Sequence, residues 1–180
     1  AVALIRSAVD GHNGLWADLG AGRGTFTRAL ARILSADSTI VAVDRDSDAL
    51  AEIASWAKAE APNVTTARGD FTETLALPEN PGGFDGMLLA NALHFVKEPG
   101  PVLARLARML SPGGRLVLVE YDRGAASRWV PYPIAIASLP GLSEAAGLTR
   151  FRVVESRPSN YEGIIYCAVA GSGDPSLRPG

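Results

Sequence analysis

The sequence of 180 residues contains a single cysteine and has almost no excess of charge of either sign. Cys167 cannot form a disulfide within the chain, so the fold cannot depend on a disulfide framework. Lysine and arginine together number 17 and aspartate and glutamate 19, which leaves a formal net charge of −2. Without a basic field to attract polyanions, the chain is expected to bind no nucleic acid.

Long apolar runs are also missing. None approaches the ~20 residues needed to cross a bilayer, and residues 1–10 lack the apolar core of a secretory signal. We therefore expect a cytoplasmic protein without a membrane span. A hydrophobic fraction of 47% with 20% charged residues argues against disorder. The length suits one domain, predicted over 1–170, with the Gly/Pro/Ser-rich residues 171–180 as a disordered tail.

Short apolar runs rich in β-branched residues alternate with segments of helical periodicity, which is typical of an α/β fold. The runs are too continuous for strands with one exposed face, so they indicate a parallel sheet covered on both sides. The predicted strands span 15–19, 39–43, 64–67, 84–90 and 115–119. The predicted helices between them lie around 26–34, 50–57 and 101–110.

The pattern loosens over 121–140, which we predict to be irregular, and a short helix around 142–146 should end at Gly147. Strands are predicted at 150–156 and 163–170. The short turn between them makes them antiparallel, because a parallel pair needs a crossover of a dozen or more residues. The expected fold is a three-layer, doubly wound, Rossmann-like sheet of seven strands, mostly parallel, with an antiparallel C-terminal strand.

A glycine-rich segment, Asp18-Leu19-Gly20-Ala21-Gly22-Arg23-Gly24, links the first predicted strand to the first long helix. Glycines allow a tight turn and let a ligand lie against main-chain amides at a helix N-terminus. The alternative is a connection without a ligand. The next strand ends at Asp44, 20 residues after Gly24, where a carboxylate can accept hydrogen bonds from ribose hydroxyls. Asp44 could instead cap a helix, but Asp46 and Ser47 suit that role better.

The later strands also end in polar residues. Asp70 and Phe71 follow the third strand, where the carboxylate could accept from an exocyclic amine and the ring could line an apolar slot. A cap and a core residue are the equally plausible alternative. Asn91 and His94 follow the fourth strand, and Tyr121 closes the fifth. Since parallel strands bring their carboxyl ends to one edge of the sheet, this convergence predicts a ligand site there.

The glycine spacing fits a dinucleotide fingerprint poorly, because Thr25 stands where the third small residue should be. The Asp-x-Gly-x-Gly-x-Gly pattern instead resembles the first motif of the class I S-adenosylmethionine-dependent methyltransferases. The resemblance runs over roughly 15–170, through Asp44, Gly69-Asp70-Phe71, Phe84-Asp85-Gly86-Met87 and Leu110-Ser111-Pro112-Gly113-Gly114.

This resemblance implies that S-adenosylmethionine is the cofactor and S-adenosylhomocysteine the product. Nine residues would bind it, without any metal. Gly20, Gly22 and Gly24 would lie along the methionine moiety and ribose, and Asp18 would hold the loop and the α-amino end. The nucleoside would contact Asp44 at the ribose, then Arg45, Asp70 and Phe71 around the adenine. Asn91 would sit beneath the sulfonium.

Methyl transfer from a sulfonium depends mainly on positioning, and a general base is optional. His94 is the candidate if one is needed, since its ordinary pKa suits proton transfer near neutrality. A packed or gating residue is the more ordinary interpretation of the same histidine. Residues that could contact the acceptor are His94, Tyr121, Trp129 and Tyr132.

Related enzymes that methylate nucleic acid bases carry Pro-Pro-Tyr after the fourth strand, whereas this chain has Asn91-Ala92-Leu93-His94. The pattern looks more like the small-molecule branch, including quinone-pathway enzymes, with an O, N or C acceptor. Few residues precede the first strand, so the substrate lid is thin; missing N-terminal residues or a partner in a homodimer could complete it. The alternatives are a non-catalytic S-adenosylmethionine-binding module or dimer partner and, less favoured, an NAD-dependent reductase.

Overall fold

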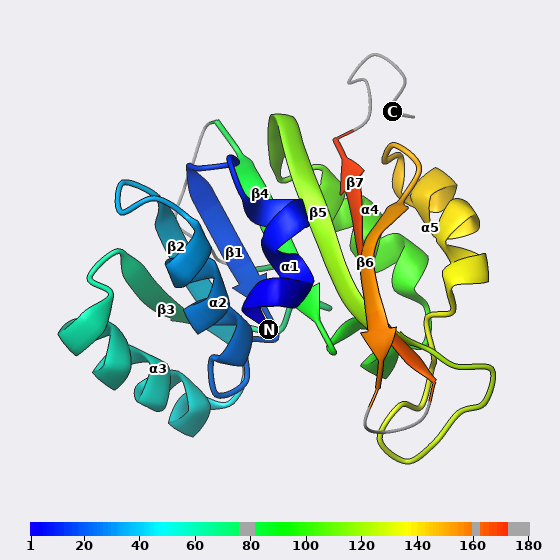
Figure 1. Ribbon diagram of the computed structural model, residues 1–180, viewed down its shortest axis with the longest axis horizontal. Helices are drawn as coiled ribbons and strands as arrows, with labels where there is room; N and C mark the ends of the chain where they lie inside the picture. The colour runs from blue at the N-terminus through cyan, green and yellow to red at the C-terminus, as the bar shows by residue number, and fades with distance from the viewer. Residues whose placement is uncertain (76–81, 160–162, 173–180) are drawn as a thin grey trace.

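The computed structural model describes residues 1–75, 82–159 and 163–172. Its centre is a seven-stranded sheet in the order β3-β2-β1-β4-β5-β7-β6 (Figure 1). Strand β7 is antiparallel to both of its neighbours, and the other adjacent strands run parallel. This confirms the predicted sheet. The strands are β1 Leu15–Leu19, β2 Thr39–Asp44, β3 Val64–Arg68, β4 Phe84–Ala90, β5 Leu110–Asp122, β6 Arg152–Pro158 and β7 Ile164–Gly171.

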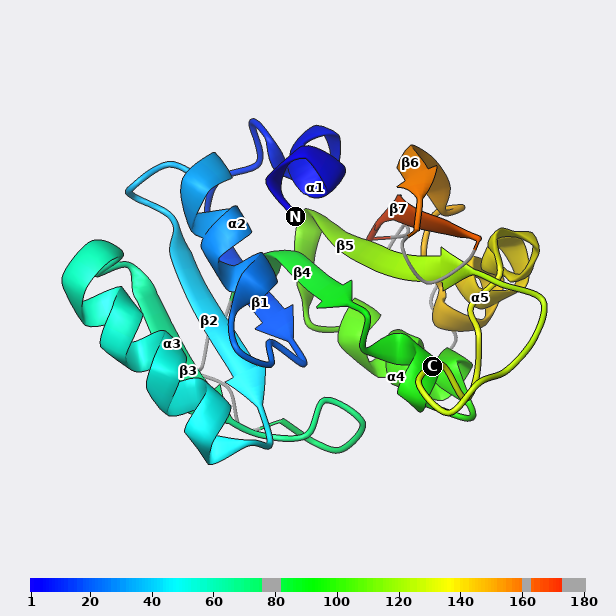
Figure 2. The same cartoon turned by 60° about the horizontal axis from the view of Figure 1, so that its bottom comes forward.

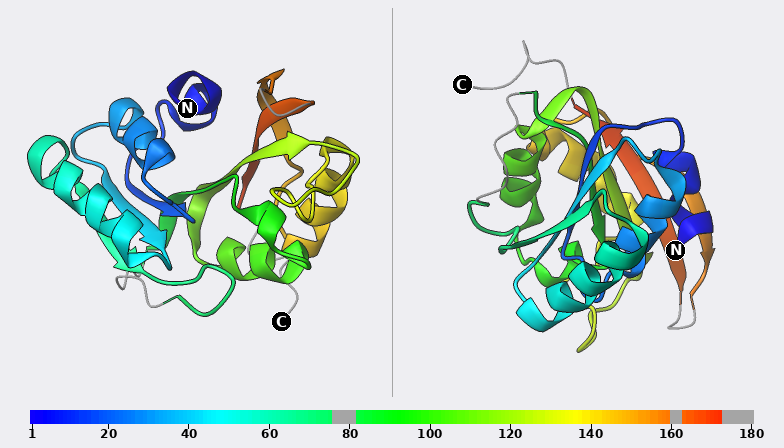
Figure 3. Two further views of the ribbon diagram at one scale, coloured as in Figure 1. Left: turned by 90° about the horizontal axis from the view of Figure 1, so that it is seen from below. Right: turned by 90° about the vertical axis from the view of Figure 1, so that its left-hand side faces the viewer.

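Helices cover both faces of the sheet, which gives the predicted three layers (Figures 2 and 3). One face is covered by α1 Val2–Val9, α2 Thr25–Ile33 and α3 Ser47–Glu60. The other is covered by α4 Pro99–Ala107 and α5 Leu139–Ala146. Two short 3-10 helices, η1 Leu93–Phe95 and η2 Ile136–Ser138, lie in the connections after β4 and β5.

Successive residues of the central strands serve opposite cores, because side chains alternate across a sheet. In β4, Met87 and Leu89 pack against the side of α4 and α5, while Leu88 packs against the side of α1, α2 and α3. All three side chains are fully buried. The near-continuous apolar runs in the sequence are therefore explained by two cores that share one sheet.

Helix α1 was not predicted. It buries Leu4, Ile5, Ala8 and Val9, and it packs against β6 and β7. The segment is short and has no side-chain cap, so its helical signal is weak. Its stability comes from packing against α2 and against β6 and β7, two strands that are more than 140 residues away in the sequence.

Several predicted boundaries were wrong by a few residues. Helix α4 begins at Pro99 and ends at Ala107, so residues 109 and 110 are not helical, and β5 begins at Leu110. Strand β6 lies two residues later than predicted. The predicted tail also begins too early: Gly171 ends β7, and Ser172 pairs with Leu148. Residues 160–162 of the predicted turn and 173–180 of the predicted tail lie outside the described residues.

Two predicted helix ends are confirmed by their local chemistry. Asp46 caps α3, because its Oδ1 accepts hydrogen bonds from the amides of Asp48 at 2.9 Å and Ala49 at 3.2 Å. Gly147 ends α5 in the left-handed conformation, with φ of 63°. Among the described residues, no helix is both long enough and apolar enough to span a bilayer.

Replacement of Gly86 by alanine should destabilise the fold. Gly86 pairs in register with Trp16 on β1, and an added Cβ would overlap the indole ring, which is fully buried. Overpacking of this kind costs about 1–3 kcal/mol. Urea denaturation should show a lower midpoint for Gly86→Ala than for the unaltered protein.

Gly141→Ala is the matched control, since no atom lies within 4 Å of its added Cβ. Because Gly141 lies within α5 and alanine favours a helix over glycine, its unfolding free energy should be unchanged or rise by up to about 1 kcal/mol. Equal midpoints for the two variants would contradict the packing of β1 against β4.

Candidate functional site

A cavity of about 460 Å³ lies at the carboxyl ends of the first four strands. Strand β2 lies on one side of β1 and β4 lies on the other, so the connections that follow β1 and β4 lead away from each other. A crevice opens where these two connections diverge. The lining comes from four separate connections. It consists of Gly20, Gly22, Asp44, Arg45, Gly69, Asp70, Phe71, Thr72, Asn91, Ala92, Phe95 and Val96.

The glycine loop is fastened to the end of β2. The amides of Gly20 and Ala21 both donate to the carbonyl of Val43, at 2.9 and 3.0 Å. Gly20 and Gly22 have φ of 76° and 51°, a left-handed conformation that glycine adopts without strain. A Cβ on Gly20 would lie 2.8 Å from Cβ of Ala92, whereas one on Gly22 would enter open space. The loop thus presents bare backbone to the cavity.

Gly24 lies outside the cavity lining. It caps the N-terminus of α2 with φ of 82°. An added Cβ there would come within 2.7 Å of the side chains of Arg28 and Ile53. Gly24 therefore serves close packing of α2 against α3 and the direction of the helix.

Asp44 connects the loop to the next helix. Its Oδ2 accepts from the amide of Gly22 at 2.8 Å, and its Oδ1 accepts from the amide of Asp46 at 2.9 Å. These two bonds fix the orientation of the carboxylate at the cavity wall. A carboxylate has about four acceptor sites, so capacity remains for hydroxyl donors from a ligand.

Asp70 and Phe71 form the wall beyond β3. Asp70 Oδ1 accepts from the amide and the hydroxyl of Thr72, at 2.9 and 2.7 Å. The Thr72 hydroxyl is the main cause of the lowered pKa of Asp70, and Arg45 and Arg105 contribute. The carboxylate is therefore charged near neutral pH. Arg105 of α4 also donates to the carbonyl of Phe71 at 2.6 Å, which holds this segment against α4.

Asn91 is the one non-glycine residue among those described with a positive φ, at 54°. Its amide donates to the carbonyl of Val119 at 2.8 Å, but its side-chain Oδ1 is buried and lacks a hydrogen-bond partner among the described residues. A strained backbone and an unpaired buried oxygen each cost free energy, and such features cluster at ligand sites. Asn91 lines the cavity between the glycine loop and η1.

Asp18 lies beneath the loop and outside the cavity lining. The side chain is 1% exposed, and Thr27 of α2 donates its hydroxyl to Oδ2 at 2.6 Å. Burial raises the pKa of Asp18 to about 6, with a smaller contribution from the negative charge of Asp44. The contacts of Asp18 tie β1 to α2 and thereby support the glycine loop.

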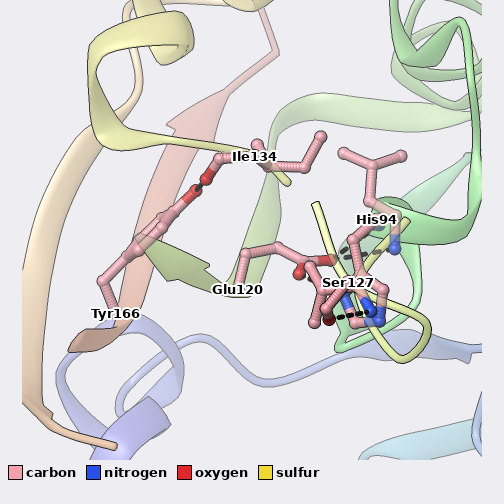
Figure 4. Close-up of polar contacts among 7 residues, drawn as sticks. His94, Glu120, Ser127, Ile134 and Tyr166 are labelled. Atoms are coloured by element: carbon pink, nitrogen blue, oxygen red, sulfur yellow. Dashed lines mark hydrogen bonds and ion pairs between the residues drawn. The ribbon is translucent and has the colours of Figure 1, made fainter. Parts of the chain in front are cut away.

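His94 and Glu120 form a buried pair next to the cavity (Figure 4). His94 Nδ1 lies 2.6 Å from Oε2 of Glu120, and Oε1 of Glu120 accepts from the amides of Leu93 and His94 at 2.9 and 3.2 Å. Glu120 thus binds both the ring and the backbone of η1. His94 is not among the cavity-lining residues, and it is 3% exposed.

Trp129 and Tyr132, two further predicted acceptor residues, lie on the segment after β5, whereas Tyr121 lies near the end of β5 itself. The amide of Tyr132 donates to the carbonyl of His94 at 3.0 Å, and the hydroxyl of Tyr166 donates to the carbonyl of Ile134 at 2.7 Å (Figure 4). These bonds attach the segment to η1 and β7. Trp129 is 74% exposed and Tyr132 41% exposed, and neither lines the cavity; nor does Tyr121, whose ring centroid lies 6.2 Å from that of His94.

The cavity includes residues that the sequence analysis did not single out, namely Gly69, Thr72, Ala92, Phe95 and Val96. Phe95 is 59% exposed, although it is a large apolar side chain. The sequence does offer one sign that Phe95 belongs to the site, namely its position shortly after the polar residues that follow β4. The side chain could not be told from a core residue, because the turn of η1 decides which way it points.

The chain matches the family described as "Methyltransferase domain" over residues 17–114. It is 30% identical to the demethylmenaquinone methyltransferase of Clavibacter sepedonicus over 145 residues, which is 81% of this chain and 54% of that protein. The chain spans about half or less of the length of the curated relatives it matches.

Solved structures share the fold. The YcgJ protein of Bacillus subtilis superposes with a TM-score of 0.76 at 13% identity, covering 96% of this chain and 98% of that one. A Burkholderia thailandensis 1,6-didemethyltoxoflavin-N1-methyltransferase, solved with bound 1,6-didemethyltoxoflavin and S-adenosylhomocysteine, gives a TM-score of 0.73 at 24% identity. That match covers 96% of this chain and 76% of the other.

The titration of Asp18 should be measurable as a pH dependence of stability. The pKa of Asp18 is about 6 in the folded state, against an ordinary value of 3.8, so the folded protein prefers the protonated form. The stabilisation is fully present below pH 3.8 and is lost as pH rises through about 6. The loss should be about 3 kcal/mol at most, at 1.36 kcal/mol per pKa unit.

Asp18→Asn keeps an acceptor for the Thr27 hydroxyl and does not ionise. The unfolding free energy of the unaltered protein minus that of Asp18→Asn should therefore fall between pH 4 and pH 7 in ligand-free protein. Asp37→Asn, at an exposed position, is the matched control and should show little change over this range. A constant difference for Asp18→Asn would mean that this carboxyl does not titrate there.

Proposed function

The chain belongs to the class I S-adenosylmethionine-dependent methyltransferase family, and from this premise we propose that it transfers a methyl group from S-adenosylmethionine to a small-molecule O, N or C acceptor. The observation that carries the proposal is the cavity at the carboxyl ends of β1 to β4. Its volume of about 460 Å³ is within the ~300–1,000 Å³ of pockets for small molecules and cofactors.

The residues of this cavity fit the cofactor. Gly20 and Gly22 leave backbone exposed where side chains would obstruct a ligand. Asn91 lines the cavity, and its buried, unpaired Oδ1 carries a partial negative charge that would be favourable close to a sulfonium cation. The carboxylates of Asp44 and Asp70 both line the cavity and would serve as acceptors for ribose hydroxyls and an exocyclic amine.

We assign the cofactor contacts accordingly. Asp44 binds the ribose, Asp70 accepts from the adenine amine, and Arg45 and Phe71 flank the base. Gly20 and Gly22 lie along the methionine moiety and ribose. Gly24 and Asp18 act from behind the loop, through the start of α2 and the bond to Thr27.

The cofactor supplies an activated methyl group on a positively charged sulfur. The chain then has to align an acceptor atom with that methyl group, and such positioning can lower a barrier by about 7–11 kcal/mol. The rigid attachments of the loop, of Asp70 and of η1 serve this alignment.

The acceptor would approach beside Asn91 and η1. Phe95 lines the cavity there, Tyr121 lies near the end of β5, and Trp129 and Tyr132 lie on the segment that follows β5. If the acceptor must lose a proton, His94 is the candidate to take it. Its Nδ1 faces Glu120, so Nε2 is the ring nitrogen left for a substrate.

The small-molecule assignment is supported by charge and sequence. The net charge of −2 provides no general attraction for a nucleic acid, and Asn91 is followed by Ala92 rather than by proline. Family membership also removes the support for an NAD-dependent reductase.

Asp44→Ala should weaken S-adenosylhomocysteine binding at least tenfold, because the ribose hydroxyls would lose their acceptor in a partly desolvated site. Calorimetric titration measures this directly. Asp37→Ala, an exposed change at the opposite end of β2, should bind like the unaltered protein. Asp44→Asn retains an acceptor for the Gly22 amide and separates loss of charge from loss of loop structure. Equal affinity for all three variants would contradict the assignment.

Turnover is tested by incubating the protein with methyl-labelled S-adenosylmethionine and the low-molecular-weight fraction of a lysate. We expect a labelled small molecule and an equal amount of S-adenosylhomocysteine, both reduced in Asp44→Ala. Tight cofactor binding without any labelled product would instead identify a binding module. Thermal stabilisation by NADH but not by S-adenosylhomocysteine would overturn the proposal as a whole.

A further inference from the structure

A second, smaller cavity lies at the end of the sheet opposite to the cofactor cavity. Strand β5 begins and β7 ends there, at the top of Figure 1. Its volume is about 240 Å³, and three arginines contribute to its lining: Arg115, Arg150 and Arg152. Thr149 and the backbone at Gly113 and Gly171 complete most of the wall. None of the described residues that line this cavity is acidic.

The sheet register brings two of these arginines to one face. Arg115 pairs with Gly171 on β7, and Arg152 on β6 pairs with Val169. Val169 packs against the core on the side of α1. Arg115 reaches the same side, since its Nη1 donates to the carbonyl of Ala8 in α1 at 3.1 Å. Arg115 and Arg152 therefore lie on the same face of the sheet, on either side of the end of β7.

These positive charges are not compensated. Within residues 1–75, 82–159 and 163–172, none of the three arginines forms an ion pair, and Nε of Arg115 is buried without a hydrogen-bond partner. Burial and the nearby charge of Arg152 both lower the pKa of Arg115. The charge of Arg115 also contributes to the lowered pKa of His12, after desolvation. A buried donor without a partner and two like charges both raise the free energy of the free protein.

We propose that Arg115, Arg150 and Arg152 form a binding site for a tetrahedral oxyanion, either free phosphate or the phosphate group of a small phosphorylated molecule. Planar guanidinium groups form paired hydrogen bonds to phosphate oxygens, which suits arginine to this task better than lysine. The cavity is below the ~300 Å³ at which pockets for whole drug-sized ligands begin, so it fits one anionic group.

The proposed site is independent of methyl transfer. It lies at the amino end of β5, whereas the cofactor cavity lies at the carboxyl ends of β1 to β4. An anion held by Arg115 and Arg152 would also connect α1, β5 and β6, because Arg115 is bonded to α1. Binding should therefore stabilise the fold itself.

The test uses the full chain with saturating S-adenosylhomocysteine, which blocks the glycine loop as a competing anion site. Sodium phosphate and phenyl phosphate are titrated separately, with potassium chloride added to hold the ionic strength constant. Thermal unfolding and ¹H–¹⁵N correlation spectra are recorded. We expect a saturable rise in Tm and shifts centred on the amides of Gly113, Thr149 and Gly171. Tighter binding of phenyl phosphate would identify a phosphorylated molecule as the ligand, and equal or weaker binding would identify the free ion.

Arg150→Gln and Arg152→Gln change exposed side chains, so both variants should fold. Each should weaken phosphate binding at least tenfold. Arg32→Gln, an exposed change of the same charge on α2, should bind phosphate like the unaltered protein. The proposal is overturned if phosphate has no effect beyond that of chloride, if its shifts map elsewhere, or if all three variants bind it equally.

Discussion

The site depends on the attachment of the glycine loop to the end of β2. Val43 and Asp44 together accept from the amides of Gly20, Ala21 and Gly22, and these bonds span two parallel neighbours of the sheet. The loop cannot move without the strand, and the carboxylate cannot turn without the loop. The groups assigned to the methionine end and to the ribose of the cofactor are therefore held in one rigid unit before any ligand arrives, which reduces the entropy lost on binding.

The same principle extends across the crevice. Arg105 of α4 holds the carbonyl of Phe71, and Glu120 of β5 holds two amides at η1. Each wall of the cavity is thus fixed by a charged side chain from a different element. Glu120 has a further effect, because the segment after β5 is bonded to the backbone of His94. The buried carboxylate of Glu120 therefore helps to hold both the η1 wall of the cofactor cavity and the segment after β5, which we propose lies near the acceptor.

Much of this arrangement could be predicted from the sequence, because it follows from local rules. Parallel strands end at one edge, so Asp44, Asp70 and Asn91 were expected to converge, and all three line the cavity. Asp46 was expected to cap α3 from its position alone. Features that arise from distant contacts were not predictable in this way. Helix α1 packs against the distant strands β6 and β7 as well as against α2.

The roles of individual polar side chains were harder still to predict. Nothing in the sequence near His94 shows that its Nδ1 forms a hydrogen bond with Glu120, which lies 26 residues later. Asp18 could not be separated from the cavity residues by spacing, because the hydroxyl of Thr27 draws its carboxylate beneath the loop. Arg115 lines the same cavity as Arg150 and Arg152 only because β7 lies between β5 and β6.

The two ends of the sheet differ in whether their buried polar groups have partners within the chain. Asp18 and Glu120, the buried carboxylates among the described residues, both lie toward the carboxyl ends of their strands. Each is compensated within the chain, by the Thr27 hydroxyl and a raised pKa in one case and by His94 with two amides in the other. These groups can therefore shape a cavity without binding a ligand themselves. At the opposite edge Arg115 lacks such compensation, and since an unpaired buried donor gains most from a new partner, that edge has more to gain from an anion.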